Sequence, residues 1–301
     1  SVIDDTATPM GKRLLYSWIL NPLIEKKDID ERLDTVSLFV ENRELLKNVK
    51  ELLSNVNDIS RITGKIGLAR ANGRDLKGLQ ISLEYISKIR SQLSSIPQIS
   101  KEIEKFDETI NSIVEKIDDC IVDSPPTTLF EGGIVKSSYN KEVEELRDLS
   151  GDSKGWIKEF EEQEKKSTGI SSLKIGFNKI FGYYIEVTRT HQEKVPERYI
   201  RKQTLVNSER YITEELKQKE EIILNAQGRL NELEYTLFNE FRDSLITFIP
   251  MLQELSEYIA RIDIFLGFAQ IAIDRDYCKP EIYNMGEENG KISINSGRHP
   301  I

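Results

Sequence analysis

Apolar residues recur every three or four positions along most of the chain, which is the spacing of helices that bury one face. Thr8 stands directly before Pro9 and such a pattern, and this pair is typical of the first turn of a helix. Asp28, followed three residues later by Glu31, predicts a capping box that starts the next helix. Similar amphipathic segments continue to Ile121. The pattern therefore predicts an all-helical domain in the first part of the chain.

Two longer amphipathic patterns follow, at residues 140–166 and 213–248. Their apolar residues fall in steps of three and four, and Thr213 is the expected cap of the second helix. Pro250 is expected to break or bend this helix, because proline cannot donate the backbone hydrogen bond of a helix interior. We expect the two patterns to pair as antiparallel helices that run out and back.

The period of the pattern changes between these two helices. In LKIGFN and GYYIEVTR every second residue is apolar, and residues 178–182 between the two runs are expected to form a turn. An antiparallel pair of helices would hold this small sheet at the end where the first helix finishes and the second begins. We expect Lys179 and Asn207 to lie near each other there. The fold class expected is mainly α. A helical core and two long antiparallel lever helices would carry a small α+β domain with a short antiparallel sheet.

Composition narrows the classes of function. The 301 residues carry a formal charge of −9, which argues against a protein that binds nucleic acid or an anionic membrane through its whole surface. Cys120 and Cys278 lie far apart without a metal or redox spacing, which favours a reducing, intracellular compartment. No apolar run reaches the roughly 20 residues of a membrane span, so we expect no membrane partner.

Basic residues gather in the stretch that contains the expected sheet. Residues 173–211 include eight basic and four acidic side chains, a formal charge of +4, so the remainder of the chain carries −13. Lys and Arg together with Asn, Gln and Ser are suited to the phosphates of a nucleic acid that is bound without regard to sequence. The alternative is an ordinary solvated surface, with the tyrosines in the core of the sheet rather than stacked on bases.

Two long motifs in this stretch resemble a known family. GFNKIFGYYIEVTR and the following VPERYIRKQTLVNSERYITEELKQKEEIILNAQ resemble the clamp and the adjoining lever of the MutS mismatch-repair proteins of bacterial type. SVIDDTATPMGKRLLYSWILNPL and LLSNVNDISRITGKIGLARANGRDL are similar to the family's core domain, and ISINSGRHPI is similar to the start of its ATPase domain. The resemblance covers essentially the whole chain. It implies the core and first lever helix at 1–165, the clamp at 166–215, the second lever helix and the return to the core at 216–285, and the start of the ATPase domain at 286–301.

The resemblance implies a DNA-binding function. In the MutS family two protomers form a ring around duplex DNA, the clamps close over the backbone, and the levers couple them to the ATPase domains. The expected partners are therefore double-stranded DNA and, in the full-length protein, a second copy in a homodimer, in the cytoplasm at the nucleoid. ATP and magnesium would belong to the family's ATPase domain. Because the sequence contains no GxxxxGK[ST] phosphate loop, we expect no cofactor and no enzyme activity for this fragment.

The family's contacts with the DNA backbone come from a hairpin turn and from the segment after the RxQT motif. In this sequence they correspond to Asn178, Lys179, Ile180, Arg201, Lys202, Asn207 and Ser208. Family members often have a basic residue at the position of Val206, so one charged contact is expected to be absent here. For Arg201, Lys202 and Arg210 the alternative is an ion pair with Glu197 or Glu209.

Two other classes of protein stay open. The first is a coiled-coil protein-interaction module with a basic tip, which the charge pattern alone allows. The second is an enzyme, but His191 and His299 lack a cysteine or carboxylate at the spacing of a metal site or a catalytic triad. The many acidic residues resemble solvated helix faces rather than acid–base pairs.

Overall fold

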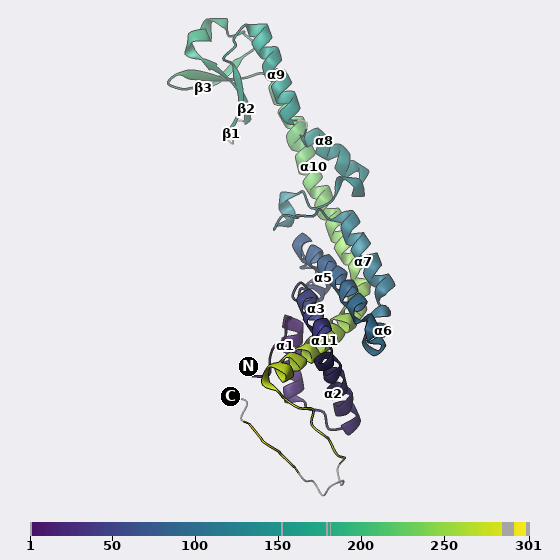
Figure 1. Ribbon diagram of the computed structural model, residues 1–301. Coiled ribbons are helices and arrows are strands. Elements are labelled where there is room, and N and C mark those ends of the chain that lie inside the picture. Colours follow the sequence, from purple (N-terminus) through teal and green to yellow (C-terminus); the bar gives the residue numbers. More distant parts are fainter. Residues whose placement is uncertain (1, 152, 179, 181, 285–291, 299–301) are drawn as a thin grey trace. The chain divides into compact units, whose positions relative to one another are not determined.

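The structure is a computed structural model that describes residues 2–151, 153–178, 180, 182–284 and 292–298 (Figure 1). The chain divides into two compact units. Unit 1 combines Ser1–Thr127 with Asn239–Ile301, and unit 2 is Thr128–Phe238. The boundary falls within one long helix, α10 (Glu214–Ser244).

Unit 1 is helical in its described residues, as the sequence predicts for the first part of the chain. Its helices are α1 (Pro9–Leu20), α2 (Lys26–Glu41), α3 (Arg43–Leu53), α4 (Ile59–Gly67), α5 (Gly73–Gln92), α6 (Pro97–Glu104), α7 (Asp107–Cys120) and α11 (Ile249–Arg275), with the short 3-10 helices η1 (Leu93–Ser95) and η5 (Leu245–Phe248). Helix α11 packs against α1, α2, α3 and α4, and α5 packs against α3 and α7. The core therefore lies along α5 and α11.

The helical path is interrupted between α10 and α11, close to the proline in the sequence. Helix α10 ends at Ser244, η5 follows, and Pro250 lies in the first turn of α11. A proline is tolerated there because the first N–H groups of a helix have no partner within the helix. The predicted break at Pro250 is confirmed.

Two predicted helix starts have different outcomes. Thr8 caps α1, since its hydroxyl oxygen accepts a hydrogen bond from the N–H of Gly11 at 3.0 Å. The capping box expected at Asp28 and Glu31 is wrong, because α2 already begins at Lys26 and Asp28 lies within its first turn. A carboxylate is favourable in a first turn because it faces the positive end of the helix dipole, so acidic residues near a helix start do not locate the cap itself.

A buried carboxylate joins α11 to the start of α1. Asp263 accepts hydrogen bonds from the N–H groups of Ala7 and Thr8, both at 2.8 Å, and from the Thr8 hydroxyl at 2.7 Å. Burial raises the pKa of Asp263, and these three donors oppose the rise. The carboxylate leaves no room above Gly11, where a Cβ would lie 2.2 Å from an Asp263 carboxylate oxygen. Glycine is required at this close approach.

Unit 2 carries the predicted pair of long helices. Its elements are α8 (Lys141–Gly151), α9 (Ser153–Thr168), the short helices η2 (Leu129–Glu131), η3 (Ser137–Tyr139) and η4 (Arg189–Lys194), strands β1 (Lys174–Asn178), β2 (Gly182–Thr188), β3 (Ile200–Thr204) and β4 (Ser208–Ile212), and α10 up to Phe238. The pattern at 140–166 forms two helices, and Asp152 between them lies outside the described residues. The predicted cap of α10 is confirmed, because the Thr213 hydroxyl accepts from the N–H of Leu216 at 3.2 Å.

The two helical segments of unit 2 run antiparallel, as predicted. Val143 and Leu146 of α8 pack with Ala226 and Leu230 of α10. Further along the chain, the ring of Trp156 in α9 lies 5.8 Å below the ammonium group of Lys219, which precedes Ala226. Later residues of the first segment thus contact earlier residues of the second. Figure 1 shows α8 beside α10 within unit 2.

The four strands form one antiparallel sheet in the order β1-β2-β4-β3. Two hairpins, β1–β2 and β3–β4, build it, and η4 lies on the connection between them. Asn178 pairs with Gly182 at one end of β2, and Ser208 pairs with Thr188 at the other end. The expected fold class, mainly α with a small antiparallel sheet, is confirmed.

The expected closeness of Lys179 and Asn207 does not fit this register. Lys179 itself lies outside the described residues. Its neighbour Asn178 is at the end of the sheet opposite to Asn207, because the two ends are separated by the length of β2. Six steps of about 3.3 Å along a strand amount to roughly 20 Å. The β1–β2 turn and the β3–β4 turn therefore lie at opposite ends of the sheet, and not together at one end.

Replacing Gly11 by alanine is expected to lower the free energy of unfolding by about 1–3 kcal/mol, because the new Cβ overlaps the fixed carboxylate of Asp263. Gly64 in α4 is the matched control, since a Cβ there meets nothing within 4 Å. Gly64→Ala is expected to raise the free energy of unfolding by about 0.5–1 kcal/mol, because alanine loses less backbone entropy in a helix. Urea unfolding of the whole chain measures both. Equal stability of the two variants would contradict this account of Gly11.

Candidate nucleic-acid interface

The two faces of the sheet have different environments. Ile185, Val187 and Tyr211 are buried on the inner face in a cluster that includes Phe160 of α9 and Leu216 of α10. The alternate residues of the same strands, which include Glu186 and Arg210, form the outer face. Most charged side chains on this sheet therefore belong to its outer face, its edges and its turns. Glu209 is an exception, because it lies opposite Val187 and two residues before Tyr211, and it is therefore a buried carboxylate on the inner face.

The β1–β2 turn, which we call the first tip (residues 178–182), is held by one side chain and by one helix. The Asn178 side-chain oxygen accepts from the N–H of Ile180 at 2.8 Å, and Ile180 is 91% exposed. Gly182 has φ +79°, and a Cβ on it would lie 1.9 Å from a carboxylate oxygen of Glu220 in α10. Glu220 also accepts a hydrogen bond from the backbone of Tyr183, and burial raises the pKa of Glu220. The turn thus rests on α10.

The β3–β4 turn, which we call the second tip (residues 205–208), lies at the other end. Asn207 is exposed, and its carbonyl accepts from the N–H of Arg189 at 3.2 Å. Val206, at the position where the resemblance implies that a charged contact is absent, is 83% exposed. Ser208 is only 8% exposed, so its side chain has little access to a ligand. Sequence reasoning could not find this burial, because Ser208 begins a strand whose register only the fold determines.

The two basic residues after Ile200 lie at a bulge on the edge strand. The pairing of β3 with β4 shifts between Arg201 and Gln203, and Lys202 falls at this shift. Arg201 donates to the buried carboxylate of Glu209 at 3.4 Å, which is one of the two ion-pair partners predicted for it. Lys202 is exposed and makes no ion pair with a described residue. Of the two residues, Lys202 is therefore the one whose charge is not compensated by a described carboxylate.

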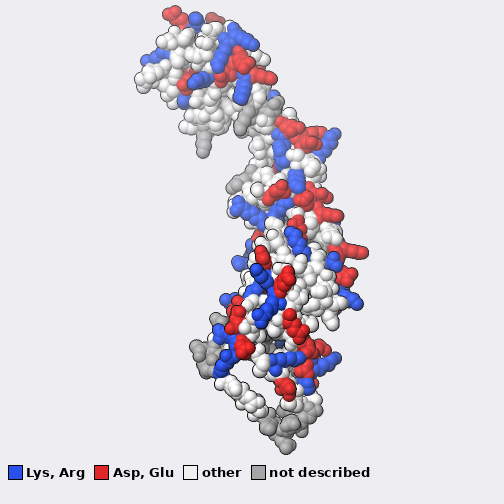
Figure 2. Space-filling model, in the orientation of Figure 1, with Lys and Arg blue, Asp and Glu red and all other residues white. Residues whose placement is uncertain are grey.

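Arg210 and Arg198 are held in the same way by carboxylates of unit 2. Arg210 pairs with Glu186 at 2.9 Å rather than with Glu197 or Glu209, and its guanidinium lies 4.2 Å from the centre of the Tyr184 ring. Arg198 pairs with Glu164 at 2.7 Å. The Arg210–Glu186 pair lies within residues 173–211 and leaves their formal charge at +4, whereas Glu164 lies outside this stretch and compensates one of its cations. Figure 2 shows Lys and Arg interspersed with Asp and Glu on the surface of unit 2.

Glu164 is the buried anchor of this region. It lies in α9 with 6% of its surface exposed, and both Arg198 and the hydroxyl of Tyr199 donate to it. Burial raises the pKa of Tyr199, and the hydrogen bond to Glu164 adds to this rise. The sequence gives no signal for this role, because Glu164 stands in a run of glutamates on a helix that otherwise resembles a solvated surface.

Comparison with known proteins decides the family. The family model described as "MutS domain III" matches residues 1–269. The chain belongs to the MutS family. It is 45% identical to the DNA mismatch repair protein MutS of Caldicellulosiruptor bescii over 301 residues, which are 100% of this chain and 34% of that protein.

Other MutS relatives agree in identity and in extent. The DNA mismatch repair protein MutS of Syntrophomonas wolfei is 44% identical and that of Halothermothrix orenii is 41% identical, each across 100% of this chain. The chain covers 35% and 33% of those two proteins. It therefore spans about a third of the length of the curated relatives it matches. The resemblance found in the sequence is confirmed.

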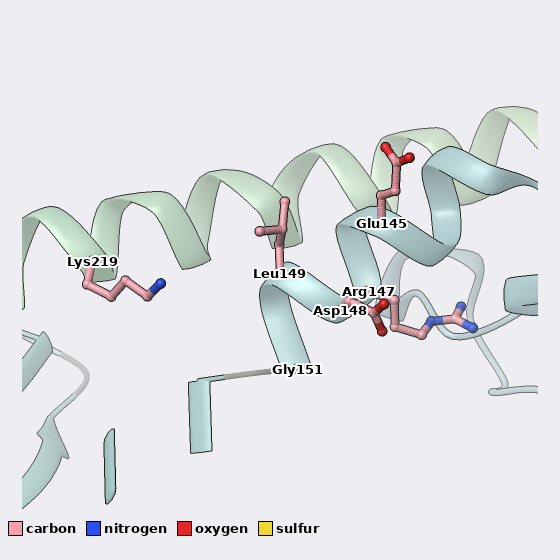
Figure 3. A pocket seen from close by; sticks show the side chains of 6 residues that line it. All are labelled: Glu145, Arg147, Asp148, Leu149, Gly151 and Lys219. Carbon is pink, nitrogen blue, oxygen red and sulfur yellow. The ribbon is translucent and has the colours of Figure 1, made fainter. Parts of the chain in front are cut away.

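One hollow in unit 2 of this MutS chain does not have the character of a cofactor site. It is open, has a volume of about 860 Å³, and is lined by Glu145, Arg147, Asp148, Leu149, Gly151 and Lys219 (Figure 3). Arg147 is already bound to the buried carboxylate of Glu234. Within the described part of the chain, no three His, Cys, Asp or Glu residues are grouped as a metal site would need. Nor is any described helix both long enough and apolar enough to cross a bilayer.

Replacing Tyr199 by phenylalanine is expected to lower the free energy of unfolding by about 1 kcal/mol, because the buried Glu164 carboxylate loses one hydrogen bond. The chain offers a matched control in Tyr16, which is 66% exposed. Tyr16→Phe is expected to change the stability by less than about 0.5 kcal/mol. Urea unfolding followed by circular dichroism measures both variants. If Tyr199→Phe were as stable as the parent chain, Glu164 would not be the anchor described above.

Proposed function

We propose that residues 166–215 of this MutS chain are a clamp that binds duplex DNA through its phosphate backbone without reading the sequence. The observation that carries the proposal is the pair of turns at opposite ends of one sheet, with Asn178 in one and Asn207 in the other. Amide side chains donate to phosphate oxygens, and Lys202 adds a charge that no described carboxylate neutralises. The names of the relatives, DNA mismatch repair proteins, support a DNA ligand.

The proposed contacts differ in how they reach the DNA. Asn178, Lys202 and Asn207 would act through their side chains, whereas Ser208 would act through its backbone because its side chain is buried. Arg201 would share its guanidinium between Glu209 and a phosphate. The full set proposed is Asn178, Lys179, Ile180, Arg201, Lys202, Asn207 and Ser208.

We further propose that the helices on either side of the clamp couple DNA binding to an ATPase. In this proposal residues 1–165 form the core and first lever helix, 216–285 form the second lever helix and the return to the core, and 286–301 start an ATPase domain. ATP and Mg²⁺ would bind elsewhere in the whole MutS protein, since this sequence has no phosphate loop and is not expected to hydrolyse ATP itself. Two copies would enclose the DNA as a homodimer, in the cytoplasm at the nucleoid.

The 301-residue chain is expected to bind matched and mismatched duplexes equally, because backbone contacts carry no sequence information. Fluorescence anisotropy with two labelled duplexes that differ at one base pair measures the two affinities. A strong preference for the mismatched duplex would contradict the proposal of a backbone clamp. Binding that does not weaken as salt rises would instead favour a protein-interaction module.

Replacing Lys179 and Lys202 together by alanine is expected to weaken binding to both duplexes alike. The slope of log affinity against log salt should flatten by roughly one to two units, because each phosphate contact contributes about 0.9. Lys12→Ala with Lys141→Ala is the charge-matched control, since these lysines are 74% and 87% exposed and lie outside the sheet. An unchanged slope in the first double variant would remove both lysines from the site.

A further inference from the structure

A cluster of hydroxyl groups lies beside the second tip and is not used by the contacts proposed above. The Thr188 hydroxyl oxygen at the end of β2 lies 3.1 Å from both the Thr190 hydroxyl oxygen and Nδ1 of His191. The Thr190 hydroxyl oxygen is also 3.1 Å from Nδ1, and the Ser172 hydroxyl is 3.3 Å from that of Thr188. Ser172 and Thr190 are exposed, so the cluster opens to solvent.

The imidazole of His191 has one nitrogen inside this cluster and one outside it. Nδ1 is engaged by the hydroxyls of Thr188 and Thr190. Nε2 has no hydrogen-bond partner among the described residues. When the ring is protonated both nitrogens donate, so Nδ1–H is satisfied by a threonine oxygen and Nε2–H is available to an external acceptor. Histidine is the side chain whose charge changes most readily near neutral pH, so pH is the variable that tests this donor.

Arg189 lies between the cluster and the second tip. Its N–H donates to the carbonyl of Asn207 at 3.2 Å, and one guanidinium nitrogen donates to the carbonyl of Leu205 at 3.0 Å. These two bonds fix the backbone and the side chain of Arg189 against the turn. The guanidinium makes no ion pair with a described carboxylate and is exposed, so its other donors are open to a ligand.

The charges around the imidazole favour an anion. Its own segment contributes Arg189, Glu193 and Lys194, and the β3–β4 turn contributes no charged side chain. On β2 the nearest acid is Glu186, which Arg210 of β4 neutralises at 2.9 Å, while β1 contributes Lys174 opposite Glu186. Glu209 of β4 is buried and bound to Tyr211 and Arg201. Glu193 is thus the one uncompensated acid among these groups, against three cations.

We propose that Thr188, Arg189, Thr190 and His191 form, with Asn207, a phosphate site on the second tip that binds the DNA backbone more tightly when His191 is protonated. The inference rests on the proposed clamp function and deepens it. Because the first tip lies roughly 20 Å away along the sheet, the two tips contact separate phosphates. One sheet then contacts the duplex at both tips, and the affinity of the second tip for phosphate depends on pH.

The test measures the affinity of the whole chain for a fluorescein-labelled homoduplex at pH 6 and pH 8, at constant ionic strength. The parent chain is expected to bind about threefold to tenfold tighter at pH 6, because a neutral hydrogen bond becomes a charge-assisted one. Its salt slope should steepen by up to about 0.9 at the lower pH, as expected for one added phosphate contact. His191→Gln should abolish the difference between the two pH values, and Arg189→Ala should weaken binding at both.

His299→Gln is the matched control, since His191 and His299 are the only histidines in the sequence. It should keep the pH dependence of the parent chain. Circular dichroism of each variant confirms that the chain is folded. If His191 had a purely structural role, the His191→Gln variant would still bind DNA more tightly at pH 6 than at pH 8. DNA binding that is equal at pH 6 and pH 8 in the parent chain, or that loses its pH dependence in His299→Gln, would overturn the phosphate site and leave the clamp standing. No DNA binding at either pH would overturn both.

Discussion

The small sheet of unit 2 depends on the burial of one of its faces against two helices. Its strands have five or seven residues, and a sheet of that size does not bury enough apolar surface to be stable alone. Ile185 and Tyr211 are covered by Phe160 of α9 and Leu216 of α10, and Glu164 of α9 holds Arg198 and Tyr199. Because this face supplies the stability, the exposed side chains of Ile180 and Asn207 at the two turns are not needed for the packing of the sheet.

The helices of this chain could be predicted from the sequence because their signals are local. Apolar spacing locates α10 and α11, Pro250 locates the break between them, and the Thr8 cap is visible as a single residue. The start of α2 could not be predicted from Asp28, because acidic residues favour the whole first turn and not one position. A helix start without a side-chain cap leaves no clear signal in the sequence.

The candidate site could be predicted only in part, because its geometry depends on the order and register of the strands. Alternating residues indicate the hairpin β1–β2, but they do not show that β4 pairs with β2 and that β3 is the edge strand. That order places Asn207 at the opposite end from Asn178, buries Ser208, and gives Arg210 the partner Glu186. The resemblance to the MutS family identifies the two turns, whereas their separation requires the fold.

The central claim is that DNA contacts the two tips of the sheet. Hydrogen–deuterium exchange of the whole chain, with and without a homoduplex in excess, tests it most directly, because exchange reports each segment separately. The account predicts slower exchange on DNA binding in peptides that cover residues 176–183 and 187–208, with no change in α1, α3 and α5 of unit 1. Protection confined to the helices of unit 1, with unchanged exchange across the sheet, would contradict it.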